Sequence, residues 1–204
     1  MNQEPIRYGI LGGSFNPPHY GHLALAETAR VQLQLTRVLF APAGQPPHKP
    51  DRELTTSEDR VAMVRAAIAD NAHFALSRVD VDRPGPHYTV DMIARLRAAY
   101  PHVTHWVFLM GEDSLHDLPT WRDPEDILAH VDLAVMPRLS KRVDMEELTA
   151  KIPTLEEQLT WLNIPPVNYA ATDLRRRVGK GLPLRYLVPP AVESIIRQRN
   201  LYRD

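Results

Sequence analysis

The sequence of 204 residues contains no cysteine, which excludes disulfide bridges and thiolate metal sites. It also has no apolar run that reaches the roughly 20 residues needed for a membrane-spanning helix. The first residues, "MNQEPIRYGILGG", lack the charged-then-apolar layout of a secretory leader. We therefore expect a cytoplasmic protein without a membrane partner.

The sequence also has no surplus of basic or of acidic residues. Lys and Arg number 24 and Asp and Glu number 25, which gives a formal net charge of -1. A general nucleic-acid binder usually carries a basic surplus, so we expect no nucleic-acid partner. Proline, by contrast, is plentiful, and its clusters fall between apolar runs, where proline stiffens loops.

Strand-like apolar runs alternate with helical patterns along the chain. Thr55 and Glu58 have the spacing of a capping box at the start of one such helix. The pattern predicts strands at residues 6–11, 37–42, 74–81, 106–111 and 132–137, and longer helices at about 21–33, 55–70, 88–100, 172–181 and 189–202. Residues 139–167 are harder to interpret, with a helix favoured at 145–152 and a strand at 158–164.

Alternating strands and helices indicate an α/β fold, namely a doubly wound, Rossmann-like parallel sheet with helices on both faces. The last forty residues add a C-terminal helical extension. Because no linker, repeat or low-complexity segment interrupts the chain, we expect residues 1–204 to form a single domain.

The stretch "GILGGSFNPPHYGHLALAETA", residues 9–29, follows the first predicted strand and opens the first predicted helix. Ligands of doubly wound sheets lie at such a place. Gly12 and Gly13 let a phosphate or sugar approach the main chain, and the helix N-terminus attracts an anion. His19 and His22 are close enough in sequence to present both rings to one point. Neither G-x-G-x-x-G nor a Walker A lysine is present, so we predict a phosphate site built on imidazoles.

"HYGH" resembles the H-x-G-H motif of the nucleotidyltransferase superfamily. The segments "GGSFNPPHYGHL", "PPHK", "PHYTVDMI", "GEDSLHDLPTW", "YAATDLR" and "LVPPAVESIIRQRNLY" occur in the order seen in bacterial nicotinate-nucleotide adenylyltransferases, from about residue 8 to the end. The resemblance implies transfer of the adenylyl group of ATP to nicotinate mononucleotide, which forms deamido-NAD and pyrophosphate in NAD biosynthesis. It also implies that Mg²⁺ enters with ATP.

The resemblance assigns roles to particular residues. Catalytic roles fall to His19, His22 and Arg175, and ATP contacts to Gly12, Gly13, Ser14, Phe15, His19, His22, Gly111, Asp113, Thr172 and Arg175. Contacts to the nicotinate nucleotide fall to Tyr88, Thr89, Trp121 and, on weaker grounds, Lys49. Thr172 sits where a helix N-cap is expected. No His, Asp and Glu cluster has the spacing of a fixed metal site, so we expect no metal bound by the protein alone.

Some interpretations stay open. Asp113 could cap a helix instead of contacting ribose, and Trp121 could be a packing residue. Ala170 stands where many members have Ser, and Asn16 where Asp is common. A sister enzyme using nicotinamide mononucleotide or phosphopantetheine, or a non-catalytic nucleotide-binding module, are the alternative functions. The sequence leaves the oligomeric state open.

Overall fold

The computed structural model describes residues 5–45, 54–138, 142–165 and 169–203. Its strands form one sheet in which every neighbouring pair is parallel, in the order β3-β2-β1-β4-β5-β6. The strands are β1 (Arg7–Gly13), β2 (Arg37–Pro42), β3 (Phe74–Leu76), β4 (His105–Gly111), β5 (Asp132–Met136) and β6 (Leu159–Trp161).

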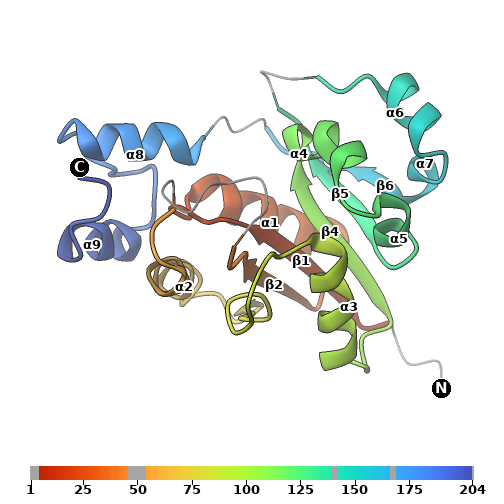
Figure 1. The fold of residues 1–204 in the computed structure, drawn as a ribbon, viewed down its shortest axis with the longest axis horizontal. Helices are drawn as coiled ribbons and strands as arrows, with labels where there is room; N and C mark the ends of the chain where they lie inside the picture. The colour runs from red at the N-terminus through yellow and green to blue at the C-terminus, as the bar shows by residue number, and fades with distance from the viewer. Residues whose placement is uncertain (1–4, 46–53, 139–141, 166–168, 204) are drawn as a thin grey trace.

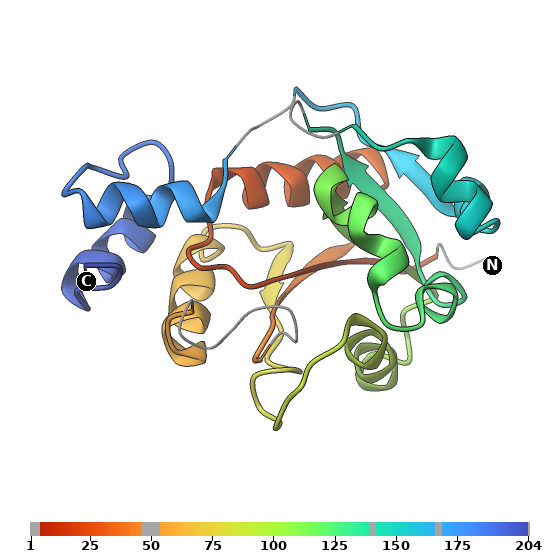
Figure 2. The same cartoon turned by 45° about the horizontal axis from the view of Figure 1, so that its top comes forward.

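Helices cover both faces of the sheet, because successive strand residues point to opposite faces and both faces are apolar. In β4, Val107 and Leu109 belong to one hydrophobic cluster and Phe108 and Met110 to the other. The first cluster includes residues of α1 (Tyr20–Gln32), α2 (Ser57–Ala67), α8 (Ala171–Gly179) and α9 (Pro190–Gln198). The second includes residues of α3 (Thr89–Ala99), α4 (Glu112–Asp117), α5 (Pro124–Leu128), α6 (Met145–Lys151) and α7 (Leu155–Gln158). Figure 2 shows α1 and α3 on opposite sides of the strands, so the predicted doubly wound fold is confirmed.

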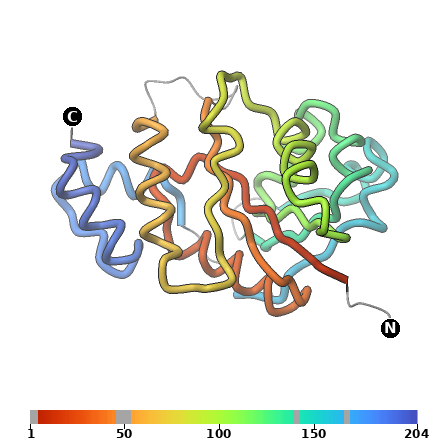
Figure 3. Tube along the Cα trace, turned by 90° about the horizontal axis from the view of Figure 1, so that it is seen from below, coloured from red at the N-terminus to blue at the C-terminus, as the bar shows by residue number. Residues whose placement is uncertain are grey.

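The predicted C-terminal helical extension is also confirmed. In Figure 1, α8 and α9 lie at the end of the molecule opposite α6 and α7. Figure 3 shows α9 beside α2, and Arg199, which follows α9, forms an ion pair of 2.6 Å with Asp59 of α2. Proline opens α9, and its buried Val192 and Ile196 are one turn apart on the same face. None of the helices in the described ranges has the length and apolar character needed to cross a bilayer.

Two local expectations are wrong. Helix α2 is capped by Thr56, whose hydroxyl accepts the backbone N–H of Asp59 at 3.1 Å, and not by a Thr55–Glu58 box. The strand expected at 74–81 ends at Leu76. Residues 78–82 form a turn instead of a strand. The backbone N–H of Asp82 donates to the carbonyl of Arg78, and the Arg78 guanidinium forms an ion pair with the Asp82 carboxylate.

The less readable segment follows its expected pattern, with a helix at 145–151 and a strand at 159–161. The short helix α7, which immediately precedes this strand, was not expected.

Candidate active site

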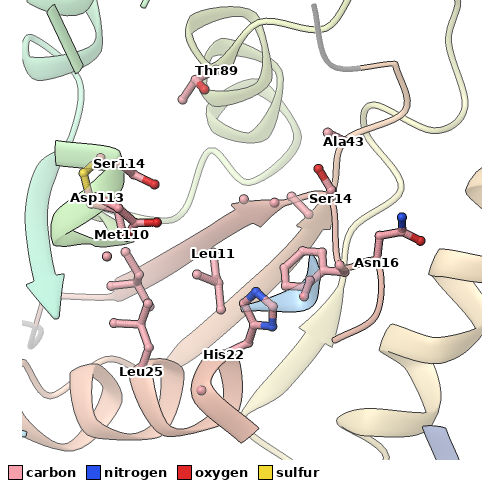
Figure 4. Close-up of a pocket in the computed structure, with 18 of the residues that line it drawn as sticks. Leu11, Ser14, Asn16, His22, Leu25, Ala43, Thr89, Met110, Asp113 and Ser114 are labelled. Carbon is pink, nitrogen blue, oxygen red and sulfur yellow. The ribbon is translucent and has the colours of Figure 1, made fainter. Parts of the chain in front are cut away.

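A cleft of about 590 Å³ opens at the carboxyl ends of β1 and β4. The chain runs outward from β1 to β2 and β3 and then returns to β4 on the other side of β1, so the cleft lies where the strand order reverses. Figure 4 shows His22 and Thr89 on opposite sides of it, with Asp113 and Ser114 near one end and Asn16 near the other. With the exception of Lys49, every residue assigned to ATP or the nicotinate nucleotide lines this cleft. Lys49 lies outside the described residues.

The end of β1 and the turn after it bring their backbone to the cleft, through Gly12 and Gly13 of the strand and Ser14 and Phe15 of the turn. A β-carbon on Gly12 would lie 3.3 Å from the Phe108 ring, so packing alone already favours glycine there. A β-carbon on Gly13 would meet only ordinary contacts, 3.6 Å from the Phe15 ring. The protein leaves room for a side chain at Gly13, and the glycine keeps that stretch of main chain open to a ligand.

Phe15 gives the turn its sharp direction. Its φ of 48° lies in the left-handed region, which a bulky side chain rarely adopts. The buried ring packs against Phe40 and lies 4.9 Å from the His22 ring, centroid to centroid. The Phe15 ring thus supports His22 from below, and its predicted contact with ATP stays a prediction.

His19 and His22 stand together at the start of α1, as predicted. The rings stack with centroids 3.8 Å apart and planes 22° apart. His19 occupies the N-cap position, and its backbone N–H donates to Nδ1 of His22 at 3.2 Å. Since Nδ1 of His22 accepts this hydrogen bond, the ring proton is assigned to Nε2.

His19 is buried, and its Nδ1 has no hydrogen-bond partner among the described residues. Burial, followed by the positive charge of Arg138, lowers the pKa of His19 from 6.5 to about 4. The His19 ring is therefore neutral at neutral pH and can donate a hydrogen bond to an anion without placing a buried charge in the cleft.

Arg175, on α8, contacts the turn between β1 and α1 although the two are far apart in sequence. One guanidinium nitrogen donates to the carbonyl of Asn16 at 2.9 Å, and the other to the hydroxyl of Thr172 at 3.3 Å. Thr172 is not the helix cap that we expected, because α8 begins at Ala171 and Ala170 holds the cap position with extended backbone. The carbonyl of Ala170 accepts the first helical N–H groups, and the Thr172 hydroxyl engages Arg175 instead.

Asp113 lies in the first turn of α4, whose cap is Gly111, so a capping role for Asp113 is excluded. Its carboxylate lies 3.4 Å from Nε of Arg138. A β-carbon on Gly111 would meet the Asp113 carboxylate and, at 3.1 Å, Nε of Arg138; both are ends of flexible side chains that can move aside, so packing does not require the glycine. Arg138 lines the cleft and was missed by sequence reasoning. Its position directly after the fifth strand was the available signal.

Trp121, Tyr88 and Thr89 also line the cleft, and Figure 4 shows Thr89 across it from His22. The Trp121 ring packs edge-on against Phe108, with centroids 5.9 Å apart, and it also faces the cleft, so packing and ligand contact are compatible. Tyr88 caps α3 and Thr89 begins it, as expected. The guanidinium of Arg122 lies 4.8 Å above the Tyr88 ring.

Arg60, also missed, is a buried support of the cleft. Its guanidinium donates to the backbone carbonyls of Ser14, Ala43, Gly44 and Thr55, at 2.6 to 3.3 Å. These carbonyls belong to the loops that follow β1 and β2 and to the residues before α2. The Arg60 guanidinium therefore fixes the position of the loop after β1 relative to the loop after β2.

His87 also holds a loop beside the cleft by hydrogen bonds to the main chain. Its Nδ1 accepts the backbone N–H of Gln45 at 2.7 Å, and its Nε2 donates to the carbonyl of Arg83 at 3.2 Å. Through these two contacts His87 supports the loop that follows β2. Within the described residues, no group of three His, Cys, Asp or Glu side chains could hold a metal ion.

Comparisons with known proteins show which family the chain belongs to. The profile of the cytidylyltransferase-like family matches residues 10–177. A probable nicotinate-nucleotide adenylyltransferase of Thermomicrobium roseum is 49% identical over 97% of this chain and 92% of its own length. One of the same description from Roseiflexus is 42% identical over all of both chains.

Among solved structures, the nicotinic acid mononucleotide adenylyltransferase of Plasmodium falciparum complexed with NaAD superposes with a TM-score of 0.78. The alignment covers 97% of each chain at 19% identity, so this likeness concerns the fold. Full-length identity to the bacterial relatives carries the family assignment: the chain belongs to the nicotinate-nucleotide adenylyltransferases of the cytidylyltransferase-like family.

Proposed function

We propose that this chain transfers the adenylyl group of ATP to nicotinate mononucleotide and releases pyrophosphate, forming deamido-NAD for NAD biosynthesis. The observation that carries the proposal is the meeting of His19, His22 and Arg175 in one cleft, although Arg175 lies far from the pair in sequence. The 49% identity to a relative described as such an enzyme supports the same substrate pair. A cytoplasmic location belongs to the proposal, because ATP is a cytoplasmic substrate.

The proposed reaction is an in-line displacement at phosphorus. An oxygen of the nicotinate mononucleotide phosphate attacks the α-phosphorus of ATP, and a new P–O bond forms. The bond from that phosphorus to the α–β bridging oxygen breaks, and pyrophosphate leaves with the electron pair. The attacking phosphate is already ionised at neutral pH, so no general base is needed. The protein has to align two anions and neutralise the charge on the leaving group.

At the ATP end, His19 and His22 are proposed to donate hydrogen bonds to the phosphates as charge develops on the leaving group. Arg175 and Thr172 would hold the β- and γ-phosphates, and the carboxylate of Asp113 would accept ribose hydroxyls. Mg²⁺ would arrive with ATP, held mainly by phosphate oxygens and water, and would neutralise phosphate charge.

At the nicotinate end, Trp121 is proposed to stack on the pyridine ring. Tyr88 and Thr89 begin α3, whose first backbone N–H groups lie beside the cleft, where they can receive a carboxylate. A carboxamide would present its own N–H groups to these donors. The acid substrate is therefore expected to be preferred over the amide.

A pyrophosphate-release assay tests the proposal. The purified protein is given ATP and Mg²⁺ with nicotinate mononucleotide, nicotinamide mononucleotide or phosphopantetheine. We expect the largest kcat/KM with nicotinate mononucleotide, loss of activity with a chelator, and recovery with added Mg²⁺. Pyrophosphate release with none of the three acceptors would contradict the proposed activity, and faster release with the amide would contradict the assigned specificity.

A further inference from the structure

The end of the chain reaches the candidate active site, although no role has been assigned to it. The segment "LVPPAVESIIRQRNLY" ends at Tyr202, only two residues before the last. The phenol hydroxyl of Tyr202 donates to Oδ1 of Asn16 at 2.8 Å, across 186 positions of sequence. Asn16 lines the cleft, immediately before the Pro-Pro-His stretch of the first motif.

Asn16 is a buried junction between several parts of the chain. Its exposed fraction is 2%. Besides Tyr202, both the hydroxyl and the backbone N–H of Thr55 donate to its Oδ1, at 2.9 and 3.4 Å. A backbone N–H can only donate, which identifies this atom as the oxygen of the amide. The main-chain carbonyl of the same residue accepts Nη1 of Arg175 at 2.9 Å.

We propose that Tyr202 is a positioning residue for the phosphate-binding groups: its hydroxyl fixes Asn16, and the carbonyl of Asn16 in turn fixes the guanidinium of Arg175. The inference rests on the proposed function, since it takes Arg175 as a phosphate ligand. It adds the C-terminal end of the chain to the parts that build the ATP site. Tyr202 itself touches no reacting atom in this scheme.

The surroundings of Tyr202 suit this role. Burial raises the pKa of its phenol above the usual value, so the hydroxyl keeps its proton at neutral pH and remains a donor. Its φ of 63° lies in the left-handed region, which a bulky residue adopts only when neighbouring contacts hold it. Such contacts are present: the Arg199–Asp59 ion pair ties the preceding turn to α2, and the N–H of Leu201 donates to the carbonyl of Ile196.

The variant Tyr202→Phe keeps the ring and removes only the hydroxyl. We expect kcat/KM for ATP to fall about tenfold, the loss that one buried hydrogen bond can carry. KM for nicotinate mononucleotide should change by less than about twofold, because that end of the cleft is not touched. Tyr186→Phe is the matched control, since Tyr186 belongs to the same C-terminal region but is 77% exposed. It should behave as wild type.

A double-mutant cycle separates positioning from general support of the fold. In an Arg175→Lys background the guanidinium fork is gone, so adding Tyr202→Phe should have little further effect on ATP affinity. Fully additive losses would overturn the proposal, as would a folded Tyr202→Phe protein with unchanged ATP affinity and turnover. If Tyr202→Phe does not fold, Thr55→Val tests the same junction, because Thr55 also holds Oδ1 of Asn16, and unchanged ATP affinity there overturns the proposal.

Calorimetric titration with ATP keeps this test independent of the reaction. If wild type binds ATP but releases no pyrophosphate with any acceptor, the proposed activity fails, while the affinity difference between wild type and Tyr202→Phe still decides the role of Tyr202. The opposite result, normal turnover in wild type and an unaltered Tyr202→Phe enzyme, would leave the activity standing and remove Tyr202 from the site.

Discussion

Because the pKa of His19 is lower in the folded protein than in the unfolded chain, the free energy of unfolding depends on pH between these two pKa values. The ring is buried, and burial together with the charge of Arg138 lowers its pKa to about 4, from 6.5 in the unfolded reference. As the pH falls below 6.5, the unfolded chain binds the proton first. The contribution of His19 to stability is therefore complete above that value, falls through the window, and stops falling below about pH 4.

The expected size follows from the two pKa values. A shift of about 2.5 units corresponds to about 3 kcal/mol over the whole window, of which about 2 kcal/mol is lost between about pH 7 and about pH 5. Urea unfolding of wild type and His19→Gln at both pH values measures this loss, because glutamine does not titrate. Wild type should lose about 2 kcal/mol more than the variant. His116→Gln is the control, since His116 is exposed. If the free energy of unfolding fell by the same amount in wild type and His19→Gln, the assignment of a buried, neutral His19 ring would be refuted.

Three substitutions test other parts of the site. His22→Ala should lower kcat by about 10²- to 10³-fold, as for other donors that stabilise developing charge, with little change in the thermal midpoint; unchanged turnover in a folded variant contradicts the assignment. Trp121→Ala should raise KM for nicotinate mononucleotide by about tenfold or more and leave ATP affinity nearly intact, because an aromatic stack is lost; equal losses for both substrates would indicate a packing role only. Arg60→Met should lower the free energy of unfolding by about 3 to 5 kcal/mol in urea, because it leaves four backbone carbonyls without their charged donor; a loss below about 1 kcal/mol would show that water replaces it.

The fold and the place of the cleft follow from the sequence for physical reasons. A strand buried on both faces needs apolar residues at every position, and "RVLFAP" and "WVFLMG" supply them as short runs between helical patterns. Once the strands are parallel, the segments after their carboxyl ends converge on one edge of the sheet. The residues at and just beyond the end of β1, which include Gly13 and His19, therefore lie beside those at the end of β4, which include Gly111 and Asp113.

What the sequence did not reveal depends on contacts between distant segments. Thr55 and Thr56 are equally good caps by residue type, and the choice between them is tertiary: the Thr55 hydroxyl is engaged by Asn16, which leaves Thr56 to cap α2. The same holds for Arg60, whose four carbonyl partners come from two connections, the β1–α1 turn and the segment between β2 and α2. A charged residue on an amphipathic helix gives no sign in the sequence that it faces inward.

The use of imidazoles in place of lysine follows from the charges around them. Arg138 already acts on His19, and Arg175 stands at the neighbouring turn. A lysine at position 19 would carry its charge into a buried place beside these cations, where desolvation and repulsion both oppose it. A neutral imidazole avoids that cost and still offers a hydrogen-bond donor. In the reaction that we propose, the negative charge of the triphosphate would favour the protonated ring, so that positive charge could develop beside the leaving group.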